Sequence, residues 1–169
     1  ICQVSTTLYN AVVRADLGIV ERHNHSKPIG YVANGTDAAV SQPTKDLKFK
    51  NEFSHPVYIT SRADGNELEY TVFGSKADKD YDIELVPVSL GSYGPKTIVK
   101  QSSSLLVGQE RVEKKGSRGY SYKTYRVKKV GDKEVERNLL NESHYIPSNR
   151  VVIRGTGVAP QPSTQTQGS

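Results

Sequence analysis

The sequence contains no methionine and no tryptophan, and phenylalanine occurs only three times. Hydrophobic residues make up 35% of the 169 residues, which is thin for one large compact core, so small or elongated modules are favoured. No stretch approaches the roughly 18 apolar residues of a membrane helix. Residues 1–15 also lack the basic start of a signal peptide. The lack of methionine fits a chain cut from inside a longer precursor.

Cysteine occurs once, so an internal disulfide cannot form and cysteine usage does not fix the redox compartment. Cys2 stands at the start of a predicted helix. The apolar positions that predict this helix recur at the helical period: Val4, Leu8, Ala11, Val12 and Ala15. Gly18 is placed to end the helix in the left-handed conformation that glycine tolerates. A thiol at a helix N-terminus meets unpaired N–H groups and the positive end of the helix dipole, and both favour the thiolate.

Two of the four histidines, His23 and His25, follow a short strand predicted around Ile19 and Val20. A histidine near Cys2 could act as its base. The alternative is a small buried cysteine and two histidines in a surface loop. His-x-His with one cysteine could also bind zinc, but no Cys-x-x-Cys or His-Glu-x-x-His spacing supports this, so we expect no metal and no other cofactor.

Beyond residue 35 the pattern indicates β structure. Leu47 and Phe49 alternate with lysines, and two apolar arms, 57–63 and 67–73, flank the turn signal Asp64-Gly65-Asn66. These features predict a half-buried antiparallel sheet with the first helix packed on it. Residues 74–80 are polar and are expected to form a linker.

Four blocks in the first half carry a family resemblance: Ile-Cys-Gln-Val-Ser-Thr-Thr-Leu-Tyr-Asn-Ala (1–11), Glu-Arg-His-Asn-His-Ser (21–26), Gly-Thr-Asp-Ala-Ala-Val (35–40) and Asp-Leu-Lys-Phe-Lys-Asn (46–51). Residues 1–74 resemble the VanW-like family, named after an accessory protein of vancomycin-B-type resistance clusters. The family motif continues upstream through a run of glycines, so this resemblance implies a domain truncated at its N-terminus.

A cysteine opening a helix, followed by a strand and a histidine, is also similar to transglutaminase-like and papain-like thiol enzymes. By this likeness Cys2 would be a nucleophile, His25 or His23 its base, and Asp37 the carboxylate that orients the histidine.

The charge balance changes along the chain. Residues 1–86 hold 9 Lys and Arg and 12 Asp and Glu, whereas residues 87–157 hold 14 and 6, a net charge of +8. This balance favours anionic partners. No arginine-rich helix or aromatic RNA-binding signature is present, so we expect no nucleic acid, and an anionic wall polymer such as teichoic acid is the better candidate. Thin sheets solvated on both faces also carry many lysines, which leaves a purely structural reading open.

Glycines separate short alternating strands in the second half, with a long strand predicted at 120–130. The runs Arg-Val-Glu-Lys-Lys-Gly-Ser-Arg-Gly-Tyr and Arg-Val-Val-Ile-Arg-Gly-Thr-Gly resemble the five-glycine (G-five) domain of bacterial surface proteins, over residues 82–157. That resemblance implies an elongated all-β module that binds polymers containing N-acetylglucosamine. The residues expected to contact a ligand are an exposed tyrosine stripe and two basic neighbours: Tyr120, Tyr122, Tyr125, Arg118 and Lys123. Alternatively, the tyrosines only cover a thin sheet.

The sequence therefore predicts an α+β, mainly β chain: a truncated α+β domain (1–78), with one N-terminal helix on an antiparallel sheet, followed by an elongated all-β G-five domain (79–157) and a disordered tail (158–169). The expected function is that of an extracellular cell-envelope protein that acts at or binds the peptidoglycan wall. The alternative is a cysteine-dependent amidase or transpeptidase acting on peptidoglycan.

Overall fold

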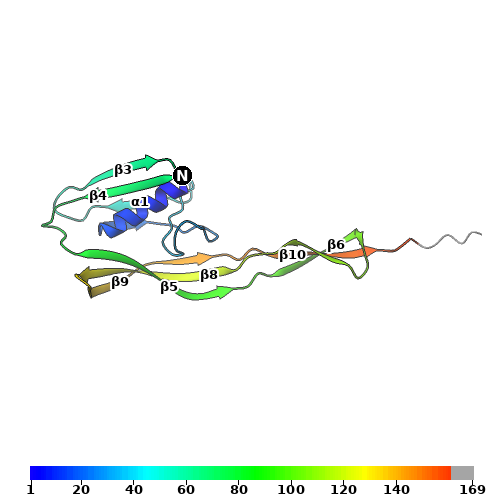
Figure 1. Ribbon diagram of the computed structural model, residues 1–169. Coiled ribbons are helices and arrows are strands. Elements are labelled where there is room, and N and C mark those ends of the chain that lie inside the picture. Colours follow the sequence, from blue (N-terminus) through cyan, green and yellow to red (C-terminus); the bar gives the residue numbers. More distant parts are fainter. Residues whose placement is uncertain (161–169) are drawn as a thin grey trace, which may run out of the picture. The chain divides into compact units, whose positions relative to one another are not determined.

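The computed structural model describes residues 1–160. This range holds one helix and a set of β-strands (Figure 1). In chain order they are α1 (Cys2–Arg14), β1 (Gly18–Glu21), β2 (Lys48–Lys50), β3 (Tyr58–Asp64), β4 (Glu67–Phe73), β5 (Asp82–Tyr93), β6 (Thr97–Leu106), β7 (Glu110–Lys114), β8 (Gly119–Val130), β9 (Lys133–Tyr145) and β10 (Arg150–Gly157). The α+β, mainly β class is confirmed. Most of the predicted tail, from residue 161 on, lies outside the described residues.

The chain folds into two compact units. The first comprises Ile1–Ser92 and Gly119–Ile146, and the second comprises Tyr93–Arg118 and the chain from Pro147 onward. The chain therefore passes between the units three times. The compact units divide the sequence differently from the ranges 1–78 and 79–157, since β8 and β9 belong to the first unit. The domain limits drawn from the sequence stay a prediction.

Helix α1 begins at Cys2, as predicted, but it ends earlier than expected. Arg14 is its last residue, and Asp16 takes the left-handed conformation at φ 61°. Asp16 can do so because its carboxylate is held by Arg126, at 2.9 Å from Nη1, and by the Tyr81 hydroxyl. Gly18 instead opens β1, so the prediction that it ends the helix is wrong.

The most deeply buried face of α1 also differs from the predicted stripe. Tyr9, Val12 and Val13 are fully buried, whereas Val4 is 43% exposed. Ser5 and Thr6 are buried as well, because their hydroxyls donate to the carbonyl of Ala38 at 2.7 and 3.1 Å. The polar partner segment at 36–40 thus decides which side of the helix faces inward.

The predicted strands of the first unit are confirmed. β1 pairs antiparallel with β2, and β3 pairs with β4 across the turn after Asp64. Helix α1 packs against β4. A second sheet has the order β5-β8-β9, and the main hydrophobic cluster joins it to the helix. That cluster consists of Tyr9, Val13, Ala38, Ile83 and Leu85.

The second unit is a three-stranded sheet with β10 in the centre, parallel to β6 and antiparallel to β7. Gly155 lies where β10 passes the end of β6. A Cβ atom at this position would stand 2.0 Å from the carbonyl oxygen of Leu106. Only glycine permits this approach of two backbones, as expected where strands cross closely.

No helix within residues 1–160 is long and apolar enough to cross a membrane.

Candidate functional site

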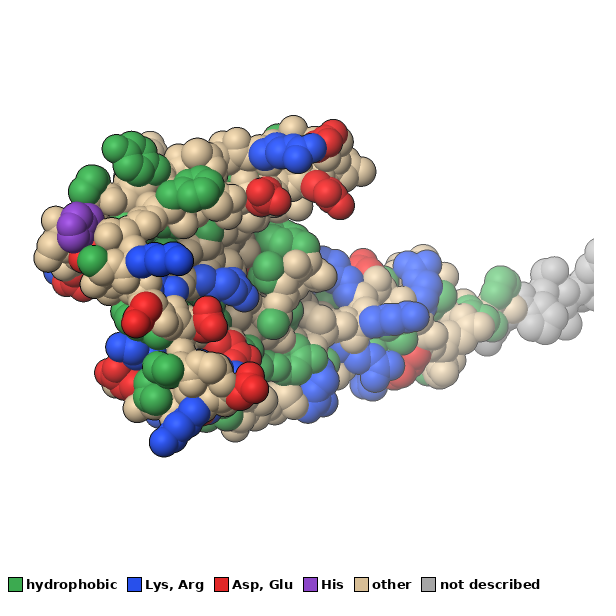
Figure 2. All heavy atoms as spheres, turned by 60° about the vertical axis from the view of Figure 1, so that its left-hand side comes forward, with side chains coloured by type: hydrophobic (Ala, Val, Ile, Leu, Met, Phe, Trp, Pro, Cys, Tyr) green, Lys and Arg blue, Asp and Glu red, His purple; other side chains and the backbone are tan. Residues whose placement is uncertain are grey.

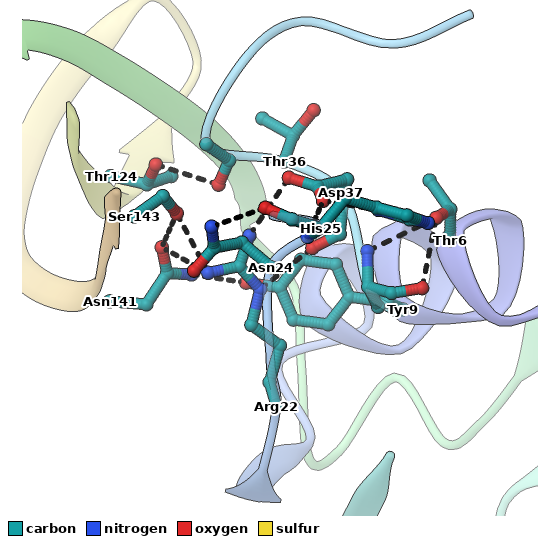
Figure 3. Close-up of polar contacts among 12 residues, drawn as sticks. Thr6, Tyr9, Arg22, Asn24, His25, Thr36, Asp37, Thr124, Asn141 and Ser143 are labelled. Carbon is teal, nitrogen blue, oxygen red and sulfur yellow. Dashed lines mark hydrogen bonds and ion pairs between the residues drawn. The ribbon is translucent and has the colours of Figure 1, made fainter. Parts of the chain in front are cut away.

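Asp37 lies at the centre of a buried polar cluster in the first unit (Figure 3). Its Oδ2 atom accepts two hydrogen bonds from His25, one from the backbone N–H at 2.7 Å and one from ring Nδ1 at 2.6 Å. The His25 side chain is 17% exposed and that of Asp37 is 1% exposed. An ionised Asp37 makes Nδ1 the donor of this hydrogen bond, which leaves Nε2 for another partner.

Arg22 provides the positive charge of this cluster, and its side chain is 3% exposed. Its guanidinium donates to Asp37 Oδ1 at 3.2 Å and, through Nε, to the Asp37 carbonyl at 2.7 Å. Its Nη1 group reaches β9, where it donates to Ser143 Oγ at 2.8 Å and to Asn141 Oδ1 at 3.2 Å. The same guanidinium lies 5.5 Å from the centre of the Tyr9 ring. The buried charge is therefore paired with a carboxylate and held by hydrogen bonds, as buried charges usually are.

Tyr145, at the end of β9, completes the cluster. Its hydroxyl donates to Asp37 Oδ1 and accepts from the Gly35 N–H at 2.7 Å. Burial raises the pKa of Asp37, but the hydrogen bonds from His25 and Tyr145 and the charge of Arg22 outweigh it, so this pKa lies below its ordinary value of 3.8. Burial and the bond to Asp37 raise the pKa of Tyr145 well above the ordinary value of 10.0. Asp37 is thus an anion and Tyr145 is neutral at physiological pH.

Tyr9 connects the helix to the same cluster. Its hydroxyl accepts a hydrogen bond from the Asn141 side chain, and burial is the main reason that its pKa rises to about 12. The sequence did not single out Tyr9, Asn141, Ser143 or Tyr145, and Tyr145 lies 108 residues from Asp37 along the chain. Arg22 was visible only as part of the block 21–26.

The structure brings His25 and Asp37 together, but it gives Cys2 and His23 other partners. The Cys2 thiol donates to the carbonyl of Val40 at 3.7 Å. His23 Nε2 lies 3.0 Å from Glu21 Oε1, on the surface. The pKa of Glu21 is lowered to about 2 by Lys48, whose Nζ lies 2.6 Å from Glu21 Oε2, and by His23. The catalytic roles predicted for Cys2, His23, His25 and Asp37 stay predictions.

The predicted ligand-binding tyrosines are half-buried, so the expectation of an exposed stripe is wrong. The rings of Tyr122 and Tyr145 meet in a T-shaped arrangement at a centroid distance of 6.4 Å, and the guanidinium of Arg137 lies 5.5 Å from the centre of the Tyr125 ring. These contacts arise because β8 lies in the middle of its sheet.

The two basic residues of the predicted ligand site differ in their surroundings. Lys123 lies 3.4 Å from Glu142, while Arg118 is exposed next to the start of β8. A ligand-binding role of the tyrosines and of these two residues stays a prediction. Among residues 1–160, no group of three or more His, Cys, Asp and Glu side chains is placed to hold a metal ion.

Comparison with known families assigns the two halves of the chain separately. Residues 1–73 match the family described as VanW like protein, and residues 92–157 match the G5 domain. The chain carries a VanW-like region followed by a G5 domain. Cys2, Arg22, His25 and Asp37 all fall in the VanW-like region. The G5 range includes β6, β7 and β10 of the second unit, and also β8 and β9, which supply Asn141, Ser143 and Tyr145 to the Asp37 cluster.

A curated relative of the VanW-like region is the uncharacterized protein YoaR of Bacillus subtilis (strain 168). It is 43% identical over 75 residues, which are 44% of this chain. The chain spans about a quarter of the length of YoaR.

Two solved structures are similar to the G5 part. The IgA1 protease G5 domain is 22% identical with a TM-score of 0.33, covering 47% of this chain and 95% of that domain. The HP0197-G5 crystal structure is 22% identical with a TM-score of 0.28, covering 46% of this chain and all of that one.

Proposed function

We propose that this chain is a cell-wall-associated protein whose second unit binds an anionic wall polymer. Three findings support the proposal: the VanW-like region, the G5 domain and the distribution of charge. Resemblance to these families implies a location in the cell envelope, and resemblance to G5 domains implies contact with wall sugars such as N-acetylglucosamine.

The distribution of charge carries the proposal. The second unit has eight Lys and Arg against two Glu, whereas the first unit has fifteen basic and sixteen acidic residues. Figure 2 shows several Lys and Arg side chains close together on the right-hand part of the coloured surface. A net charge of +6 on so small a unit attracts polyanions and steers their approach.

Ion pairs leave most of this charge uncompensated. Lys100 pairs with Glu113 at 3.1 Å and Arg154 with Glu110 at 2.8 Å. Arg111 and Lys114 form no ion pair with the described residues. Arg111 and Lys100 both lie opposite Ile153 of β10, so strand register puts these two side chains on one face of the sheet. Lys114 lies nearby, opposite Val151, where the register between β7 and β10 shifts. That face is suited to a repeating phosphate chain.

The test uses purified Gram-positive cell walls, intact or stripped of teichoic acid, and the whole chain. The double reversal Arg111→Glu and Lys114→Glu should weaken binding to intact walls about tenfold, equivalent to about 1.4 kcal/mol. A matched control, Lys27→Glu with Lys133→Glu in the first unit, changes the total charge equally and should leave binding nearly unchanged.

Binding to intact walls should fall steeply with salt, because charges more than about 8 Å apart are screened at physiological ionic strength. Equal losses in both double variants, or no binding at low salt, would overturn the proposal. Undiminished binding to stripped walls would assign it to sugar instead.

A further inference from the structure

A cavity of about 410 Å³ opens between α1 and the β3–β4 hairpin in the first unit. Its volume lies within the range of about 300–1,000 Å³ that small-molecule sites occupy. The cavity exists because the helix face that points at β4 carries alanine, at Ala11 and Ala15, where larger side chains would fill the space. None of the residues of the Asp37 cluster lines it.

The walls of this cavity are mostly apolar. Tyr70 and Val72 on β4 form one side, and Phe53 and Val57, from the segment before β3, close another. All four residues are only half-buried, so the cavity leaves apolar surface in contact with water. Covering such surface with a hydrocarbon chain is favourable because it removes apolar area from water.

The polar residues that line the cavity carry an excess of positive charge. They include Arg14, Lys76 and Lys79 against one acid, Asp78. The Asp78 carboxylate is occupied by His55, whose ring Nδ1 and backbone N–H lie 3.0 and 3.2 Å away.

The three cations have only neutral partners among the described residues. Arg14 binds the Asn10 side chain at 3.1 Å, and Lys79 Nζ donates to the Tyr81 carbonyl at 2.6 Å. Lys76 is exposed and forms no ion pair within residues 1–160. An anion placed at this end of the cavity would therefore meet uncompensated positive charge.

From this combination we infer that the cavity binds an amphiphilic anion, namely an acyl chain ending in a carboxylate. The chain lies between α1 and β4 on Ala11, Ala15 and Val72, and the carboxylate meets Lys76 and Arg14. Such a ligand matches both features of the site, since its apolar part needs no hydrogen bonds and its head group needs cations.

The experiment follows a dansyl-labelled undecanoate, whose fluorescence rises in apolar surroundings, as it binds the whole chain below its micelle concentration. Dodecanoate should displace the probe, and dodecanol should do so at least about tenfold less well. Ala11→Leu should weaken probe binding by a similar factor without lowering the melting temperature, because the added methyl groups occupy existing space. Ala77→Leu, an exposed neighbour that does not line the cavity, is its control.

Lys76→Glu tests the head group separately and remains informative if Ala11→Leu does not fold. It should weaken dodecanoate binding and leave dodecanol binding unchanged, whereas Lys27→Glu should affect neither. Absence of probe binding, or equal binding by the Ala11→Leu and Ala77→Leu variants, would overturn the proposed site. Equal affinity for dodecanol and dodecanoate would overturn the anionic part. A dimer that Ala11→Leu converts to monomer, with no probe bound, would assign the cavity to an interface between copies instead.

Discussion

At the scale of single residues, Asp37 is the common hydrogen-bond acceptor of the buried polar cluster. It accepts hydrogen bonds from His25, Arg22 and Tyr145 while its side chain is 1% exposed. Asp37→Asn keeps the shape but leaves Arg22 buried with no counter-charge. Breaking a buried pair in this way should lower the free energy of unfolding by about 3–5 kcal/mol, measured by urea denaturation. Asp46→Asn, on an exposed carboxylate, should change it by less than about 0.5 kcal/mol.

Two further measurements separate the charge of Asp37 from its shape. Adding Arg22→Met to Asp37→Asn should recover part of the loss, because the unpaired charge is gone. The folded pKa of Asp37 is depressed, so its contribution to stability is present above the ordinary value of 3.8 and disappears as the pH falls through the lower folded value. The difference between wild type and Asp37→Asn should therefore shrink below about pH 4. A difference that is constant with pH would contradict this account.

At the scale of elements, the sequence predicted what local chemistry determines. The hairpin β3–β4 follows from Asp64-Gly65-Asn66 between alternating arms, and β8 from the regular pattern after Gly119. It did not predict which face of α1 is most deeply buried, because Ser5 and Thr6 are turned inward by the Ala38 carbonyl, 32 or more residues away. Nor did it predict that the tyrosines of β8 are half-buried, since this depends on β5 and β9 flanking that strand.

Gly155 provides a test at this scale. Gly155→Ala places a methyl group against the carbonyls of Leu105 and Leu106, which are backbone atoms and cannot rotate away. The cost should reach or exceed the upper end of the range of about 1–3 kcal/mol for overpacking. Hydrogen exchange should lose protection at the Val107 and Gly155 amides, which bond across this contact. Gly94→Ala, where a Cβ atom meets nothing within 4 Å, should leave both amides protected.

At the scale of the whole molecule, the tyrosines with a raised pKa belong to the first unit. Burial raises the pKa of both Tyr9 and Tyr81 to about 12, and that of Tyr145 above its ordinary value. Because these folded values are raised, the stability that the neutral rings contribute is intact below pH 10 and is lost as the pH rises towards 12. Alkaline titration should unfold the first unit together with a rise in tyrosinate absorbance. Tyrosines that titrate near their ordinary value without unfolding would contradict this.

The sequence alone located the basic residues of the second half better than it located the members of the Asp37 cluster. The basic character of the second half was visible from composition. In the structure, however, Lys123, Arg126 and the other charged residues of β8 and β9 belong to the first unit. Asn141 and Ser143, which bind Arg22, and Tyr145, which binds Asp37, all lie on β9. Only the folded chain shows that these residues belong to the cluster, and a fragment ending at residue 78 would lack them. Such a fragment would take two hydrogen-bond partners from Arg22 and one from Asp37, while their bonds to each other and to His25 would remain.

The three passages of the chain between the units have a consequence for proteolysis. A protease that cuts near residue 92, 118 or 146 severs one covalent connection and leaves two intact. A cut between β6 and β7 also leaves both strands hydrogen-bonded to β10. A singly nicked molecule should therefore migrate as one particle until a denaturant is added.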